Sequence, residues 1–292
     1  MKLPFTKMHG LGNDFVAIDG TRRAFRPTPA LLRHLGDRRF GVGCDQIVVL
    51  EPPSAAGVDF DYRIYNSDGS EAGMSGNGSR CMARFIREQG LSGKDRVRLR
   101  TKTTTIELAL LPDGQVRVDA GVPRFEPADL PFTAPARAPR YSVTLEDGGM
   151  IEVGAASMGN PHAVIETTDL ASAPVEAIGR ALQRHPAFPQ KVNVGFLEVV
   201  DTGHAKLRVY ERGAGETLAC GSGACAAMAV GRIWGRLGPA VDMQLRGGVL
   251  RLEWGGEGQP LFMTGPAVTV YRGEIEWKEG EWEGAWVEER PT

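Results

Sequence analysis

Two glycine-rich segments decide the fold: Ser75-Gly76-Asn77-Gly78-Ser79-Arg80-Cys81 and Cys220-Gly221-Ser222-Gly223-Ala224-Cys225-Ala226. Their first residues lie 145 positions apart (220 minus 75), and each segment follows a strand pattern and a polar loop. Each also opens a helix pattern, which we expect to end at Gly90 in the first copy and at Gly238 in the second. The repetition predicts an α+β protein of two pseudo-symmetric lobes, each a mostly antiparallel sheet wrapped around a central helix.

The flanking elements follow from periodicity and from turn residues. Thr28 can cap a helix that begins at Pro29 and carries leucines on one face before Gly36. The pair Asp113-Gly114 favours a hairpin turn. Apolar runs and period-two alternation predict strands at residues 5–9, 15–18, 47–50, 59–65, 206–210, 241–245 and 249–254.

The boundary between the lobes is expected near residues 121–124. The N-terminal lobe then spans residues 1–120 and is completed by a strand from 267–277, and the C-terminal lobe spans 121–266. Residues 278–292 are rich in Glu and Gly, and we expect them to form an acidic, loosely ordered tail.

Composition limits the class of protein. The chain has 292 residues, enough for two cores, and its 42% hydrophobic and 24% charged content is that of a globular protein. A net charge of −2 with no basic stripe argues against a nucleic-acid partner. No signal-peptide core and no stretch of about 18 apolar residues occurs, so we expect a cytoplasmic protein with no membrane partner and with reduced cysteines.

The two glycine-rich helix starts favour anion binding. The first turn of a helix leaves backbone N–H groups without partners and carries the positive end of the helix dipole, so a carboxylate is a natural ligand. If two such starts face each other across a cleft, they can bind one small carboxylate between them. The same position is expected to depress the pKa of a thiol such as Cys220. Two acid/base groups on opposite sides of one carbon are what inversion of configuration requires.

Two other kinds of site fit less well. Residues 221–226 satisfy the short dinucleotide pattern G-x-G-x-x-A, and Asp242 lies about 20 residues later. In that fold the first glycine ends a strand directly, whereas here the polar stretch 211–219 intervenes. A metal site is not expected, because Cys220 and Cys225 are five residues apart with no second Cys or His pair nearby.

Nearly the whole chain resembles the diaminopimelate epimerases. The motifs that carry the resemblance occur in the family's order at residues 8–15 (MHGLGNDF), 41–46 (GVGCDQ), 65–71 (YNSDGSE), 158–162 (MGNPH), 192–193 (VN) and 211–226 (ERGAGETLACGSGACA). The related proline racemases and hydroxyproline epimerases share the two-lobe design but differ around the two catalytic residues.

The resemblance implies a cofactor-free epimerase that interconverts LL- and meso-diaminopimelate in lysine and cell-wall precursor biosynthesis, without pyridoxal phosphate or a metal. Cys220 and position 75 would be the two acid/base groups, with His162 and Glu211 near the reacting α-carbon. We also expect a homodimer. The substrate contacts that carry over are Asn13, Gln46, Asn66, Gly76, Asn77, Asn160, Asn193, Glu211, Arg212, Gly221 and Ser222.

Chemistry supports several of these roles. Arg212 can fork onto a distal carboxylate, and the asparagines can bind an ammonium and a carboxylate together. Taken singly, an asparagine in a loop is more often a turn residue, and His162 could be a structural histidine. Cys44, Cys81 and Cys225 are expected to be buried apolar residues.

The chain departs from the family at Ser75, where the family carries cysteine. An aliphatic hydroxyl is a far weaker acid than a thiol, so Ser75 cannot serve as a comparable resting base. Cys81 cannot substitute, because six residues along a helix place it about 9 Å away and about 240° around the axis.

Several explanations of Ser75 stay open at this point: an engineered Cys→Ser change, a natural epimerase of low activity that tolerates serine, or a relative with different chemistry. The last would be a dehydratase or racemase acting on another amino acid. A non-catalytic diamino-acid binding protein is a further alternative.

Overall fold

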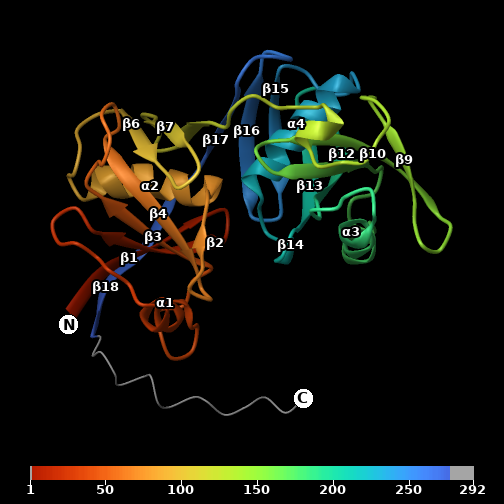
Figure 1. Cartoon of the computed structure of the whole chain (residues 1–292). Coiled ribbons are helices and arrows are strands. Elements are labelled where there is room, and N and C mark those ends of the chain that lie inside the picture. The colour runs from red at the N-terminus through yellow and green to blue at the C-terminus, as the bar shows by residue number, and fades with distance from the viewer. Residues whose placement is uncertain (1, 277–292) are drawn as a thin grey trace, which may run out of the picture. The chain divides into compact units, whose positions relative to one another are not determined.

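The computed structural model describes residues 2–276 and divides them into two compact units (Figure 1). Of the described residues, those up to Leu110 and those from Ala267 onward form unit 1, and those from Leu111 to Pro266 form unit 2. Each unit combines a largely antiparallel sheet with two α-helices, which confirms the predicted α+β class and its two pseudo-symmetric lobes. No helix within residues 2–276 is long and apolar enough to cross a membrane.

Unit 1 has the strand order β18–β1–β2–β3–β4–β6–β7, with β5 beside β4. The pairs β2 with β3 and β4 with β6 are parallel, and the other pairs are antiparallel. Its elements are β1 (Lys2–Gly10), β2 (Asn13–Asp19), α1 (Pro29–Gly36), β3 (Gln46–Glu51), β4 (Phe60–Asn66), β5 (Glu71–Ala72), α2 (Gly76–Glu88), β6 (Arg96–Arg100), β7 (Thr105–Leu110) and β18 (Val268–Glu276).

Unit 2 has the strand order β9–β10–β11–β12–β13–β15–β16–β17–β8, with β14 beside β13. Its parallel pairs are β11 with β12 and β13 with β15. Its elements are β8 (Val116–Asp119), the 3₁₀ turn η1 (Pro127–Asp129), β9 (Tyr141–Thr144), β10 (Met150–Ser157), β11 (Pro161–Glu166), α3 (Val175–Arg184), β12 (Asn193–Val199), β13 (His204–Glu211), β14 (Gly215–Thr217), α4 (Gly221–Ile233), β15 (Ala240–Leu245), β16 (Gly248–Trp254) and β17 (Leu261–Gly265).

The two units repeat one another element by element. The run β1-β2-α1-β3-β4-β5-α2-β6-β7 corresponds to β10-β11-α3-β12-β13-β14-α4-β15-β16, with the same pairing directions. The register repeats too: Ile64 pairs with Ala72 in unit 1 and Val209 pairs with Thr217 in unit 2. The duplication read from the glycine-rich segments therefore extends to single residues.

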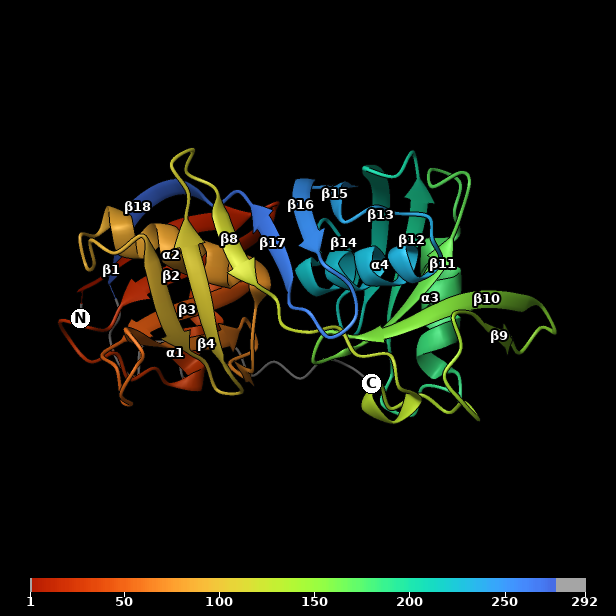
Figure 2. The same cartoon turned by 90° about the horizontal axis from the view of Figure 1, so that it is seen from above.

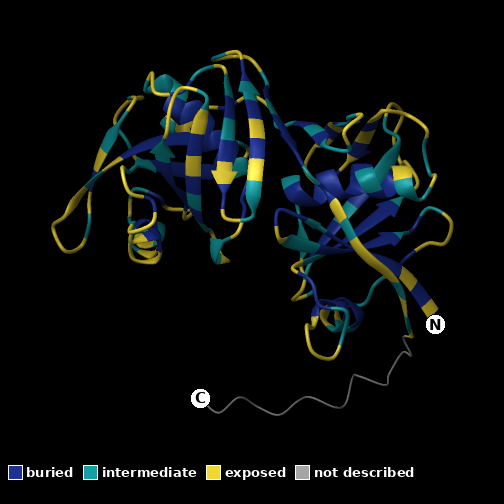
Figure 3. Cartoon of the chain, turned by 180° about the vertical axis from the view of Figure 1, so that it is seen from behind, coloured by how far each residue is buried: buried dark blue, intermediate teal, exposed yellow. Residues whose placement is uncertain are grey.

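The central strands β2 and β3 of unit 1 are buried on both faces, which explains their continuous apolar runs. In β2, Val16 and Ile18 join the leucines of α1 in one core cluster, whereas Phe15, which precedes Val16, lies on the other face, near Gly78 of α2. Figure 3 shows most of α2 as buried. A helix enclosed in this way holds the position of its first turn.

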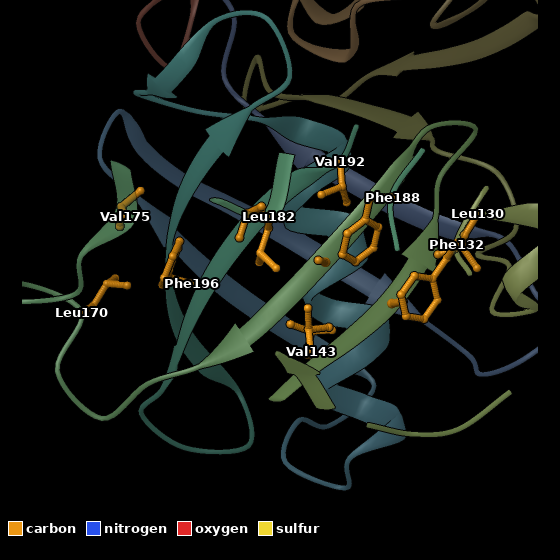
Figure 4. Close-up of a cluster of buried hydrophobic side chains, with 13 residues drawn as sticks. Leu130, Phe132, Val143, Leu170, Val175, Leu182, Phe188, Val192 and Phe196 are labelled. Carbon is orange, nitrogen blue, oxygen red and sulfur yellow. The ribbon is translucent and has the colours of Figure 1, made fainter. Parts of the chain in front are cut away.

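In unit 2, as in unit 1, two helices contact the sheet, and each contributes to the packing of the core. Figure 2 shows α4 against β12 and β13, which it contacts. On the α3 side, Leu182 of α3, Phe196 of β12 and Val143 of β9 belong to one cluster (Figure 4). In that cluster the rings of Phe132 and Phe188 stack with centroids 4.8 Å apart.

Helix α1 begins as expected and α4 ends earlier than expected. The hydroxyl of Thr28 accepts from the amide of Leu31 at 3.2 Å, so Thr28 is the predicted cap. Helix α4 ends at Ile233 rather than at Gly238, because Gly235 supplies the left-handed φ of 69° that closes the helix. Gly238 instead donates its amide to Thr202.

Unit 1 contains the strand expected from residues 267–277 but lacks residues 111–120, which were also assigned to it. Residues 111–120, placed with the N-terminal lobe in the sequence analysis, lie in unit 2, because β8 pairs with β17. β18 pairs with β1 over nearly its whole length. The turn at Asp113-Gly114 is present, with Gly114 at φ 82°. The acidic tail 278–292 lies outside the described residues.

Helix α3 packs so closely on β13 that its contact requires a glycine. A Cβ placed on Gly179 would lie 2.4 Å from Cγ of Tyr210. Overpacking of this kind costs about 1–3 kcal/mol, more than the roughly 1 kcal/mol gained from helix propensity. Gly179→Ala should therefore lower the midpoint of urea unfolding, whereas Gly93→Ala, with open space around it, should not. Equal midpoints for the two variants would contradict this packing.

Candidate active site

The expected site residues fall into two sets, one in each unit. The N-terminal half-site comprises Asn13, Gln46, Asn66, Ser75, Gly76 and Asn77, and the C-terminal half-site comprises Asn160, His162, Asn193, Glu211, Arg212, Cys220, Gly221 and Ser222. Within each unit these residues come from the ends of neighbouring strands and from the start of one helix.

Ser75 is the N-cap of α2. Its hydroxyl accepts a hydrogen bond from the amide of Gly78 at 3.2 Å, and its own carbonyl accepts from the hydroxyl of Ser79 at 2.7 Å. Serine is among the most favourable N-cap residues, so this position suits the helix whatever its chemical role. The side chain is half-buried, and it stands beside the amides of the first helical turn.

Two asparagine amides beside Ser75 are oriented by their partners. Asn77 donates to the carbonyl oxygen of Asn13 at 3.3 Å, and Asn13 donates to Asp45 at 2.8 Å. The carbonyl oxygen of Asn77 accepts from Arg80 at 2.8 Å. Because each carbonyl oxygen accepts a hydrogen bond, each amide group is turned to donate, as recognition of a carboxylate requires.

A charged network supports Asn13, and the sequence patterns do not single it out. Arg38 forks onto Asp14 at 2.9 and 2.8 Å and reaches Asp45 at 2.7 Å. The buried Lys7 bonds Asp14 at 2.5 Å and also donates to the carbonyl of Gly43. Although burial opposes it, hydrogen bonding to Arg38 and Lys7 holds the pKa of Asp14 well below its usual range. Only the position of Asp14 and Asp45 inside the quoted motifs could have indicated this network.

Gln46 and Asn66 complete the N-terminal half-site on adjacent strands. They are opposite each other in the β3–β4 register, and the Gln46 amide donates to the Asn66 carbonyl at 2.9 Å. Asn66 in turn donates to the hydroxyl of Ser70 at 3.0 Å. The expected site residues of this unit therefore lie at the ends of β2, β3 and β4 and at the start of α2.

Cys220 is the N-cap of α4, as Ser75 is of α2. Its sulfur accepts from the amide of Gly223 at 3.3 Å and lies 3.6 Å from the hydroxyl of Ser222. The expectation of a depressed thiol pKa is wrong: burial, together with the nearby carboxylate of Glu211, raises the pKa of Cys220 well above its usual value, outweighing the helix amides. The resting form is therefore the thiol, hydrogen-bonded to Glu211.

His162 is linked to Cys220 through two side chains. Its Nε2 lies 3.0 Å from the carbonyl oxygen of Asn160, whose amide donates to Ser222 at 3.3 Å. Because that oxygen can only accept, Nε2 carries the hydrogen, and Nδ1 keeps the lone pair. Burial, with the nearby charge of Arg212, lowers the pKa of His162 to about 3, so the ring is neutral near pH 7.

Asn193 and Arg212 lie at the edge of the same half-site. Asn193 accepts from the backbone amide of Arg212 at 2.8 Å and donates to the carbonyl of Pro161 at 3.2 Å. The exposed Arg212 side chain donates one Nη1 bond to the carbonyl of Gln190 at 3.0 Å, which orients the guanidinium. Its fork geometry suits a carboxylate.

The half-sites are copies of each other. Sheet register equates Gln46 with Asn193, because they pair with Phe15 and His162 at matching places. The repeat makes the following pairs equivalent: Asn13 and Asn160, Phe15 and His162, Gln46 and Asn193, Asn66 and Glu211, Ala72 and Thr217, Ser75 and Cys220, Asn77 and Ser222. The bond from Asn77 to Asn13 thus matches that from Asn160 to Ser222. The copies differ in chemistry: unit 2 has the ionisable His162, Glu211 and Cys220.

The other three cysteines are buried apolar residues, as expected. Burial raises the pKa of both Cys44 and Cys81 to about 12, so neither is a reactive thiolate at neutral pH. Cys81 therefore does not replace the thiol missing at position 75. Among the described residues, no group of three or more His, Cys, Asp or Glu side chains is arranged to hold a metal ion.

The sequence profile of diaminopimelate epimerases matches residues 5–126 and 154–270. This chain belongs to the diaminopimelate epimerase family. Named members of the family from Chromobacterium violaceum and Stutzerimonas stutzeri are 56% and 52% identical over 94% of the chain, covering 100% and 99% of their own lengths. The family's enzymes are isomerases, and the chain aligns with these relatives over almost its whole length.

Solved structures of more distant proteins share the fold. A hydroxyproline epimerase from Agrobacterium vitis has a TM-score of 0.69 at 18% identity, with 94% of this chain and 92% of the other covered. A phenazine biosynthesis protein of the PhzF family from Bacillus anthracis has a TM-score of 0.66 at 15% identity, covering 95% and 100%. Each of these likenesses supports the two-lobe architecture and nothing finer.

The neutral, buried His162 should make stability depend on pH. The unfolded chain binds a proton at this residue near pH 6.5, whereas the folded chain does so only near pH 3, so stability falls as pH drops between these values. From pH 7 to pH 5, the free energy of unfolding measured with urea should fall by about 2 kcal/mol more in the unsubstituted chain than in the His162→Gln variant. His204→Gln, at an exposed histidine, is the control. The same pH dependence in both variants would show that His162 is not the cause.

Proposed function

We propose that the chain is an amino-acid epimerase that interconverts LL- and meso-diaminopimelate, in lysine and cell-wall precursor biosynthesis, without pyridoxal phosphate. The observation that carries the proposal is the repeated helix start: each unit places a hydroxyl or thiol side chain at an N-cap, beside the first-turn amides of the helix and oriented carboxamides. Membership of the diaminopimelate epimerase family supports it.

The proposed substrate contacts divide by chemistry. The amides at Gly76-Asn77 and at Gly221-Ser222 would bind the α-carboxylate, because helix starts favour anions. The distal carboxylate would lie against Arg212, whose guanidinium is already oriented by Gln190. Binding a carboxylate at each end of the ligand would distinguish diaminopimelate from lysine, which has only one.

Cys220 is proposed as the acid/base on one face of the α-carbon. As a base, its thiol would first pass its proton to Glu211, and the thiolate would then take the α-proton. The electron pair left on carbon would be stabilised by the bound carboxylate and the helix amides. Running in reverse, the Cys220 thiol would return a proton to the same face.

Position 75 is proposed to act on the opposite face of the α-carbon. Because a serine occupies it, it is the weaker of the two acid/base groups. A hydroxyl cap accepts the Gly78 amide as a thiolate would, but it donates a proton far less readily. The chain as written is therefore proposed to be a low-activity form of the epimerase, whether natural or engineered.

Isotope exchange tests this division of labour. In deuterated water, one diaminopimelate stereoisomer should gain α-deuterium with retention of configuration, about 100-fold or more faster than it is inverted, because Cys220 works and Ser75 does not. Ser75→Cys should restore inversion, and Cys220→Ser should abolish the exchange. Mass spectrometry and chiral chromatography measure the two rates, with proline as the control substrate.

The alternatives give different outcomes in the same experiment. Equal, fast inversion of both isomers by the chain as written would show that serine suffices. Release of a β-substituent from another amino acid, with no exchange of diaminopimelate, would favour a dehydratase. Binding of both isomers with no exchange would indicate a binding protein, and faster exchange of proline would overturn the substrate assignment.

A homodimer in the cytoplasm is the proposed form of the enzyme. Four free cysteines suit a reducing compartment. Among the described residues, β18 pairs with β1 alone, and the side chains of Val268, Val270 and Tyr271 on it are exposed. An uncovered apolar edge of this kind is a template for pairing with a second copy.

The dimer can be tested by one substitution on that edge. Val270 is 55% exposed, and Val270→Lys should shift the mass measured by light scattering from dimer to monomer. Met150→Lys, at a residue 73% exposed in unit 2, is the control and should leave the dimer intact. A dimer that survives Val270→Lys would exclude this edge.

A further inference from the structure

Thr217 donates a hydrogen bond to the carboxylate of Glu211. The distance from its Oγ1 to Oε1 of Glu211 is 2.5 Å, within the range of a hydrogen bond from a hydroxyl to a carboxylate. Neither the glycine-rich segments nor the family's contact residues single out Thr217.

The β13–β14 hairpin brings these two side chains together. Thr217 pairs with Val209, and Glu211, two residues beyond Val209, lies on the same face of the strand. The two are therefore diagonal neighbours across the hairpin, within reach of each other. Cys220, which caps α4, follows Thr217 by three residues, so the hairpin positions the carboxylate beside the thiol.

The other unit lacks this contact although it has the same hairpin. In the β4–β5 pair, Ala72 occupies the place of Thr217, and Asn66 occupies the place of Glu211. The hydroxyl therefore occurs in the copy that has a carboxylate, and a methyl group occurs in the copy that has an amide. Because the backbone register is the same, sheet geometry alone does not require a hydroxyl at position 217.

We propose that Thr217 is a positioning residue for proton transfer at Cys220, acting through Glu211. Its hydroxyl holds one carboxylate oxygen, which turns the other toward the thiol. A thiolate at Cys220 and a carboxylate at Glu211 would repel each other. The thiolate therefore forms only as its proton moves onto Glu211. One S–H bond breaks and one O–H bond forms, and the proton returns by the same path. The inference rests on the proposed epimerase function.

Three variants test the role of the hydroxyl. Thr217→Val keeps the shape of the side chain but removes the donor, and it should slow α-deuterium exchange at the Cys220 face by about 10- to 100-fold at saturating substrate. The KM should change little, because Thr217 is proposed to act on the proton and not on the ligand. Thr217→Ser should restore the rate. Ala72→Val, at the equivalent place in unit 1, is the matched control.

A double-mutant cycle separates this role from a general structural one. If Thr217 acts through Glu211, Thr217→Val should add almost nothing to the loss caused by Glu211→Gln. Independent, multiplying losses would overturn the proposal, as would a failure of serine to rescue or an equal loss in Ala72→Val.

Failure of the epimerase function itself would look different. In that case the unsubstituted chain and Ser75→Cys would both fail to exchange diaminopimelate. In the Ser75→Cys background, Thr217→Val should slow exchange at the Cys220 face and leave exchange at the position 75 face within about threefold. Equal slowing of both faces would also overturn the proposal.

Discussion

Helices that begin inside a protein must find partners for their first amides, and both half-sites are organised by this requirement. At α2 and α4 the partner is the side chain of the N-cap, which is also the group proposed to move the proton. The first-turn amides of each helix point the same way, which favours an anion beside them. The surrounding sheet fixes each helix along its length, so the cap cannot drift from the strand ends that carry the carboxamides.

The two half-sites share one backbone arrangement because the units are duplicated, but they differ in the side chains at equivalent positions. Asn66 and Ala72 in one copy stand where Glu211 and Thr217 stand in the other. In the second copy a carboxylate lies beside a buried thiol, whereas in the first the buried Arg80 holds the side-chain amide of Asn77. The two copies therefore differ in their balance of amide and ionisable side chains.

Much of this arrangement could be predicted from the sequence, because local patterns encode local structure. Glycine-rich turns before apolar periodicity located both helix starts, and Thr28 with Pro29 located α1. The motifs likewise indicated the candidate site residues, and within each unit several of these are joined by hydrogen bonds. Properties that depend on burial could not be read in this way: the pKa of Cys220 is raised because the thiol is enclosed beside Glu211, which a sequence pattern does not reveal. The network of Lys7 and Arg38 also joins residues about 30 positions apart.

The pairing of β1 with β18 has a consequence for synthesis on the ribosome. Unit 2 is a continuous segment, but unit 1 needs residues from both ends of the described chain. Until β18 emerges, β1 presents an unpaired edge whose Leu3 and Phe5 belong to the core. The unit that is translated first is therefore completed last, and the nascent chain must keep that edge from associating while unit 2 folds.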